Sequence, residues 1–128
     1  IAQKTKSPVL LITDIERGGA FASIVGTMEL IEKKYVELVK GFIVNKFRGD
    51  IEILKPGYKK LRQKTGLPVF GTIPMTNFEI PDEDSIGNSP KNLNWNASSL
   101  KKLDAEINKI AKVVKSSLNI RQVEKLLK

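Results

Sequence analysis

Pro-Val-Leu-Leu-Ile-Thr, at residues 8–13, is a short apolar run that ends at Asp14 and is soon followed by Gly18 and Gly19. A continuous apolar run of this length predicts a strand that is buried on both faces of a sheet. After the two glycines the period changes, because large apolar residues recur at helical spacing, at Phe21, Ile24, Val25, Met28 and Ile31. A helix over residues 20–33 is therefore expected directly after the strand.

The same pattern of a strand and then a helix is found again further along the chain. Residues 39–47, Val-Lys-Gly-Phe-Ile-Val-Asn-Lys-Phe, predict a second buried strand. Residues 51–65 place apolar side chains on one helical face, at Ile51, Leu54, Tyr58 and Leu61. Pro56 favours a helix that begins at its own position, and Gly66 is of the type that ends helices. Residues 67–73 predict a third strand, which Pro74 closes.

Three buried strands separated by helices predict an α/β fold built on a parallel βαβαβ unit with right-handed crossovers. In open parallel sheets, ligands bind beyond the carboxyl ends of the strands. We therefore expect one site to be lined by residues 14–19, 45–50 and 74–77.

The remainder of the chain has a different character. Residues 76–97 have no period and are rich in Pro, Asn, Asp and Ser, which predicts a long loop between residues 1–75 and a helical segment at residues 98–128. Ser98 or Ser99 is the expected cap of an amphipathic helix, and a short second helix is expected after Asn119. The apolar stripe of the long helix comprises Leu100, Leu103, Ile107, Ile110, Val114 and Leu118. Its full burial is worth about 9–18 kcal/mol, so we expect it to pack on the βαβαβ unit or on a partner.

Composition narrows the possible chemistry. The 128 residues include no Cys and no His, which excludes disulfides, thiolate nucleophiles, imidazole bases and the commonest zinc ligands. The formal charge of +8 lies mostly in the tail, since residues 90–128 hold 9 Lys and Arg against 3 Asp and Glu. Few aromatic residues are present for stacking on bases, so no nucleic-acid partner is expected. With no apolar run of membrane-spanning length and no visible signal peptide, a cytoplasmic protein without a membrane partner is expected.

The first candidate site segment joins the first strand to its helix. Asp14 or Glu16 could hold a magnesium ion beside a phosphate, and Gly18 and Gly19 would let a ligand approach the backbone at the helix N-terminus. The alternative is a tight turn after a polar strand end. The full phosphate-binding pattern of a Gly, four residues and Gly-Lys-Ser/Thr is absent from the chain.

The second candidate segment follows the second strand. Asn45 could recognise a base or a carboxamide, and Arg48 could bind a carboxylate or phosphate with two parallel hydrogen bonds. The alternative is a polar loop in which Arg48 pairs locally with Asp50. A run of acids at residues 81–85 could bind magnesium or form a solvated loop.

Several of these stretches resemble cobyric acid synthase, a glutamine-dependent amidotransferase of cobalamin biosynthesis. The resemblance covers residues 6–86 in order. It rests on Pro-Val-Leu-Leu-Ile-Thr-Asp-Ile-Glu-Arg-Gly-Gly-Ala-Phe-Ala-Ser-Ile-Val-Gly-Thr (8–27), Val-Lys-Gly-Phe-Ile-Val-Asn-Lys-Phe-Arg-Gly-Asp (39–50), Leu-Lys-Pro-Gly (54–57), Thr-Gly-Leu-Pro-Val-Phe-Gly-Thr-Ile-Pro (65–74) and Glu-Asp-Ser (83–85). The synthetase domain of that family is similar to dethiobiotin synthetase, which implies a P-loop type of α/β fold.

The resemblance implies amidation, dependent on ATP and Mg²⁺, of side-chain carboxylates on the corrin adenosylcobyrinic acid a,c-diamide. It implies catalytic roles for Asp14, Arg17 and Arg48 and metal ligation by Asp14 and Glu16. It also implies cofactor binding by Gly18, Gly19, Asn45, Lys46 and Pro74.

The chain also departs from the family. The phosphate-binding loop of the family would precede Ile1, and its glutaminase domain, normally in the same chain and dependent on a Cys and a His, would follow residues 83–85. Residues 100–127 instead resemble the helical segment at the carboxyl end of the family. We therefore expect a fragment of the synthetase domain that is inactive alone. The alternative is a non-catalytic interaction module that docks on a partner through its sheet and amphipathic tail.

Overall fold

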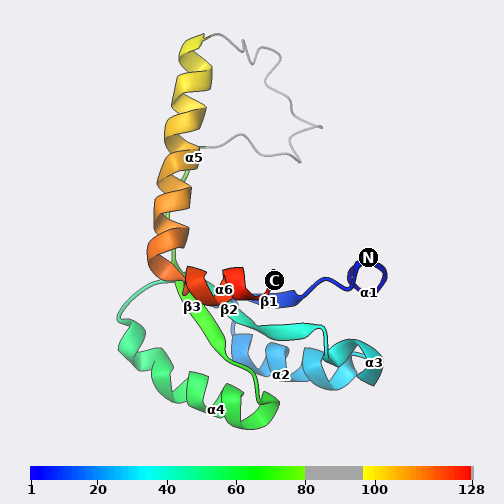
Figure 1. Ribbon diagram of the computed structural model, residues 1–128. Helices are drawn as coiled ribbons and strands as arrows, with labels where there is room; N and C mark the ends of the chain where they lie inside the picture. Colours follow the sequence, from blue (N-terminus) through cyan, green and yellow to red (C-terminus); the bar gives the residue numbers. More distant parts are fainter. Residues whose placement is uncertain (80–96, 128) are drawn as a thin grey trace, which may run out of the picture.

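The computed structural model describes residues 1–79 and 97–127 (Figure 1). It confirms an α/β chain with a parallel three-stranded sheet. The elements in chain order are α1 (Ala2–Thr5), β1 (Val9–Asp14), α2 (Ala20–Leu30), α3 (Lys33–Val36), β2 (Val39–Phe47), the 3₁₀ turn η1 (Ile51–Leu54), α4 (Lys55–Thr65), β3 (Val69–Pro74), α5 (Ala97–Ser117) and α6 (Ile120–Lys125).

The sheet has the order β1-β2-β3, with β2 in the centre. Strand β1 pairs with β2 from Val9 opposite Val39 to Asp14 opposite Asn45. Strand β3 ends with Pro74 paired to Phe47 of β2. All three strands run in the same direction, so their carboxyl ends lie at one edge, as expected for a βαβαβ unit.

Helices α2 and α4 cover one face of the sheet (Figure 1). The first core cluster joins Ile24 of α2 and Leu61 of α4 to Val39 and Phe42 of the central strand. Phe42 has no exposed surface. A second cluster, nearer the carboxyl edge, consists of Val44, Phe47 and Leu54. Because β2 supplies residues to both clusters, its packing fixes the loops that follow the strands.

Two expectations for residues 8–33 are wrong. Strand β1 is not buried on both faces, since the side chain of Ile12 is 62% exposed on the face opposite Leu11 and the first core cluster. Helix α2 stops at Leu30, because Ile31 turns to an extended backbone and packs against that cluster, before α3 begins at Lys33.

The second helical region also differs in detail from the prediction. Helix α4 begins at Lys55, so Pro56 lies in its first turn, and the preceding residues form η1. Ile51 belongs to that turn and is exposed, whereas Leu54 and Leu61 are buried as expected. Gly66 ends α4 with a left-handed φ of 73°, which confirms its predicted role.

The tail attaches to the edge strand β3 through the junction between α5 and α6. Leu118 forms an antiparallel bridge with Gly71, and the amide of Asn119 donates to the carbonyl of Phe70 at 2.9 Å. The side chain of Asn119 caps α6 by accepting from the amide of Gln122. Helix α5 begins at Ala97, so Ser98 and Ser99 both lie inside its first turn and neither is its cap. The run of acids at residues 81–85 lies outside the described residues.

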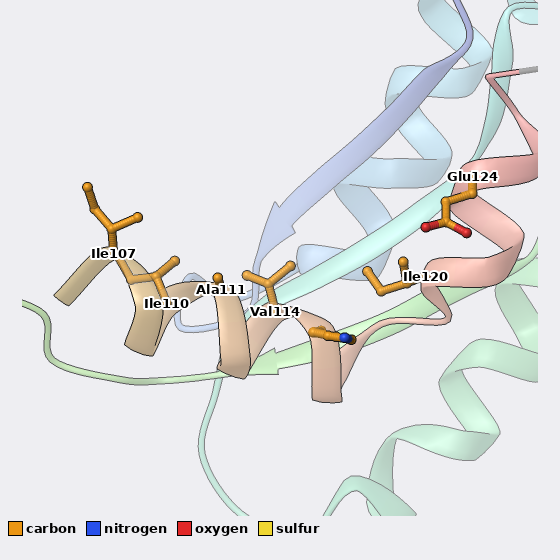
Figure 2. A pocket seen from close by; sticks show the side chains of 7 residues that line it. Ile107, Ile110, Ala111, Val114, Ile120 and Glu124 are labelled. Carbon is orange, nitrogen blue, oxygen red and sulfur yellow. The ribbon is translucent and has the colours of Figure 1, made fainter. Parts of the chain in front are cut away.

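The apolar stripe of α5 is only partly covered within the described structure. From its junction with β3 the helix extends away from the sheet (Figure 1), and both Leu100 and Ile107 are about half exposed. A groove between α5 and α6 presents apolar side chains to solvent (Figure 2); it is lined by Ile107, Ile110, Ala111, Val114, Lys115, Ile120 and Glu124. Within residues 1–79 and 97–127, no helix is both long and apolar enough to cross a membrane.

Candidate functional site

The loops that follow the three strands meet at the carboxyl edge of the sheet, as the sequence predicts. The amide of Ile15, just after β1, donates to the carbonyl of Asn45 at 3.1 Å. The amide of Met75, just after β3, donates to the carbonyl of Phe47 at 2.9 Å. These backbone bonds continue the ladder past the strand ends and bring residues 14–19, 45–50 and 74–77 together.

Asp14 is held by two contacts. One carboxylate oxygen accepts from the amide of Glu16 at 3.0 Å, and the other accepts from Lys46 Nζ at 2.8 Å. Lys46 has a left-handed backbone with φ of 61°, which is uncommon for a residue other than glycine. An ion pair therefore joins the loop after β1 to the end of β2.

A second ion pair runs parallel to the first. Arg48 Nε donates to a carboxylate oxygen of Glu16 at 2.7 Å. The alternative of a local pair between Arg48 and Asp50 is not formed, because Asp50 caps η1 and accepts from the amide of Glu52 instead. Arg48 thus reaches across to the neighbouring loop, and its side chain stays largely exposed.

The remaining candidate residues surround these two pairs. Gly19, with φ of 81°, is the N-cap of α2, where a side chain would strain the backbone. Arg17 and Gly18 are exposed and line a small hollow at the N-terminus of α2. Amides in the first turn of a helix have no carbonyl partner within the helix and attract anions. Asn45 is half-buried at the register position opposite Asp14, and Pro74 is exposed at the end of β3.

The contacts of Asp14 and Glu16 do not fit a metal site. Each carboxylate already accepts from a cationic side chain, Lys46 or Arg48. Among the residues that the structure describes, no three His, Cys, Asp or Glu side chains gather closely enough to hold a metal ion. Mg²⁺ that accompanies a nucleotide needs only one or two carboxylates besides phosphate oxygens and water, but here Lys46 and Arg48 already engage both carboxylates.

Sequence reasoning missed the two ion pairs, although the chain carries a signal for them. The acids of the first loop and the cations of the second are each two residues apart, at Asp14 and Glu16 and at Lys46 and Arg48. Strand register alone does not predict the pairs, because Asp14 lies opposite Asn45 and both Glu16 and Arg48 follow the ends of their strands. The left-handed backbone at Lys46 departs from the regular alternation of a strand, and the sequence gives no sign of it.

The hydrogen bond from Lys46 lowers the pKa of Asp14 below its ordinary value of 3.8, with help from the Glu16 amide and the charges of Lys46 and Arg17 and against the opposing effect of desolvation. The stability that this pair contributes is therefore present above pH 3.8 and is lost as the pH falls through the lowered pKa.

We expect Lys46→Gly, which accommodates the positive φ, to raise the pKa of Asp14 towards its ordinary value. Carboxyl ¹³C chemical shifts followed against pH would measure the change. Lys34→Ala removes a distant cation that pairs with Glu32 and should leave the pKa of Asp14 unchanged. A pKa of Asp14 that stays low in Lys46→Gly would show that the ion pair does not cause the shift.

Comparison with known proteins supplies the family. A cobyric acid synthase of Desulforamulus reducens is 48% identical over 108 residues, which is 84% of this chain and 20% of the relative. Probable cobyric acid synthases of Methanosarcina barkeri and Thermococcus kodakarensis are 55% and 50% identical, over 85 and 91 residues. These matches cover 66% and 71% of this chain, and 18% and 19% of the relatives.

No family model and no solved structure matches the chain, so the expected likeness to dethiobiotin synthetase stays a prediction. The chain spans about a fifth of the length of the curated relatives it matches. Identity near one half over most of the chain is nevertheless decisive for ancestry. The chain belongs to the cobyric acid synthase family and corresponds to a fragment of its members.

Proposed function

We propose that this chain forms the carboxyl edge of the synthetase domain in a cobyric acid synthase, an enzyme that amidates corrin side-chain carboxylates during cobalamin biosynthesis. One observation carries the proposal. Arg17, Lys46 and Arg48 gather at the carboxyl ends of parallel strands, in a chain about half identical to cobyric acid synthases. Cations at that edge suit a reaction whose substrates are polycarboxylates and phosphates.

The proposed reaction has two steps. A carboxylate oxygen of adenosylcobyrinic acid a,c-diamide attacks the γ-phosphorus of ATP, which forms an acyl phosphate and ADP. Ammonia released from glutamine then attacks the acyl carbon, phosphate leaves with the carbon–oxygen bond pair, and the nitrogen loses a proton to give the amide. Both steps concentrate negative charge on oxygen, which fixed cations stabilise.

The residues of this chain take binding roles in that scheme. Arg17 and Arg48 bind the carboxylate and phosphate oxygens, and Lys46 adds a third positive charge. Gly18 and Gly19 let an anion approach the first-turn amides of α2. Asn45 recognises adenine and Pro74 borders the nucleotide. Mg²⁺ bound together with ATP would supply neutralisation of phosphate charge, and we do not assign its ligation to Asp14 or Glu16, which pair with Lys46 and Arg48.

The ammonia source lies outside this chain. Glutaminase chemistry of the expected kind requires a thiolate and an imidazole, and the chain contains neither Cys nor His. A glutaminase domain elsewhere in the whole enzyme would supply ammonia. The purified chain should therefore not hydrolyse glutamine.

Replacing Arg48 tests its proposed role. In a complete cobyric acid synthase whose homologous stretch is exchanged for residues 6–86 of this chain, Arg48→Ala should lower the kcat/KM of amidation about 100-fold, because a charge-assisted contact is lost in the transition state. Arg62→Ala removes an exposed arginine from the last turn of α4 and is the matched control. Equal rates in the two variants would remove Arg48 from the site.

One observation favours the second candidate, a non-catalytic interaction module. The groove between α5 and α6 leaves apolar side chains in solvent (Figure 2). Exposed apolar surfaces of this kind mark interaction sites. Sedimentation of the purified chain discriminates, since a compact monomer at micromolar concentration disfavours the module and self-association favours it.

A further inference from the structure

Two cationic side chains at the carboxyl end of β2, Lys46 and Arg48, each form an ion pair with a carboxylate at or just after the end of β1. Lys46 contacts Asp14 at 2.8 Å, and Arg48 contacts Glu16 at 2.7 Å. We infer that Asp14 and Glu16 are positioning residues, which hold Lys46 and Arg48 in place for anionic substrates and do not ligate a metal ion. The identity of the anionic substrates rests on the proposed function. The positioning of Lys46 and Arg48 is inferred from their ion pairs with Asp14 and Glu16 alone.

The carboxylate of Asp14 is fixed on both sides. Its first oxygen accepts from the amide of Glu16 in a turn within its own loop, which sets the direction of its second oxygen. That second oxygen accepts from Lys46 Nζ. Lys46 lies in the left-handed region, which costs backbone energy and persists only where surrounding contacts maintain it. The ion pair is one such contact.

Glu16 contacts Arg48 only at Nε, which leaves the N–H donors on the terminal nitrogens of the guanidinium available to a ligand. The contact with Glu16 uses Nε, at the inner side of the guanidinium. A guanidinium has five N–H donors, and one N–H on each of its two terminal nitrogens can form the pair of parallel bonds that carboxylates and phosphates accept. The side chain of Arg48 is 67% exposed, so those donors face solvent. Glu16 thus orients Arg48 without occupying its binding edge.

Substitution by amide and by alanine separates positioning from charge. Glu16→Gln and Glu16→Ala both remove the negative charge, but only glutamine retains an oxygen that can accept from Arg48 Nε. Asp14→Asn and Asp14→Ala form the same comparison for Lys46. Glu32, which pairs with Lys34 on an exposed surface, supplies matched controls in Glu32→Gln and Glu32→Ala.

The first readout is the Arg48 Nε–H signal in NMR spectra of the free 128-residue chain. We expect the signal to be slow to exchange in the native chain, similar in Glu16→Gln, and averaged towards free arginine in Glu16→Ala. The second readout is affinity for inorganic pyrophosphate, which we expect to be about threefold tighter in Glu16→Gln than in Glu16→Ala. Both Glu32 variants should match the native chain.

Three results bear on the inference in different ways. An Arg48 signal that is unchanged in Glu16→Ala overturns it. Selective broadening of the Asp14–Gly19 amides by traces of Mn²⁺, beyond that near Glu32, also overturns it because it reveals a metal site. If the native chain and all variants fail to bind pyrophosphate while the Arg48 signal responds as expected, the positioning role holds and the proposed anion site fails.

Discussion

In the Gly71→Ala variant, the free energy of unfolding is expected to fall by about 3 kcal/mol. A Cβ atom at residue 71 would clash with the carbonyl oxygen of Ser117 and would lie 2.9 Å from the Cα of Leu118. Both are backbone atoms, so relief requires the junction of α5 and α6 to move away from β3. The hydrogen bond from the amide of Asn119 to Phe70 would be lost with that movement.

Gly26→Ala is the matched control for this prediction. It adds the same methyl group within α2, where a Cβ atom meets nothing within 4 Å. Alanine in a helix interior should stabilise the chain by about 0.5–1 kcal/mol. Urea unfolding followed by circular dichroism would measure both variants. Equal stabilities would contradict the docking of the tail on β3.

Phe42→Ala should reduce the free energy of unfolding by about 4 kcal/mol, since large-to-small changes at buried aromatic residues leave a cavity as well as losing apolar burial. Phe42 is fully buried in the central strand, where it packs with Ile24 and Leu61. A loss of this size is a large fraction of the stability of a small domain. The variant is expected to unfold at much lower urea concentrations.

Ile12→Ala provides the comparison on the neighbouring strand. Its side chain is 62% exposed, so its truncation should cost less than about 1 kcal/mol. The same unfolding experiment measures both variants. If Phe42→Ala were no more damaging than Ile12→Ala, the core would not lie between the sheet and helices α2 and α4.

The fold was predictable because local patterns and turn residues agreed along residues 8–74. The change from a continuous apolar run to helical spacing near Gly19 marked the boundary between β1 and α2 correctly, and Gly66 marked the end of α4. The burial of β1 was not predictable in the same way. An apolar residue such as Ile12 is suited to burial, but whether it is buried depends on whether a helix covers that face of the sheet. The sequence pattern of a single strand does not contain that information.

The meeting of the candidate residues at one edge of the sheet was predictable, but their contacts were not. The parallel βαβαβ arrangement predicts that Asp14, Asn45 and Pro74 lie at one edge of the sheet, where ligands bind in such folds. It did not say that Lys46 would take a left-handed backbone, or that Arg48 would pair with Glu16 and not with Asp50. Those contacts depend on strand register and backbone torsions, which the spacing of charges along a single chain does not determine.

The proposed function requires this chain to provide a working part of the synthetase domain of a cobyric acid synthase. The most direct test exchanges the homologous stretch of a complete cobyric acid synthase for residues 6–86 of this chain and follows amidation of adenosylcobyrinic acid a,c-diamide by mass spectrometry, with ATP and glutamine present. We expect a rate within about tenfold of the parent enzyme, since the edge residues keep their roles. A folded but inactive exchange, alongside an active exchange made from another family member, would contradict it.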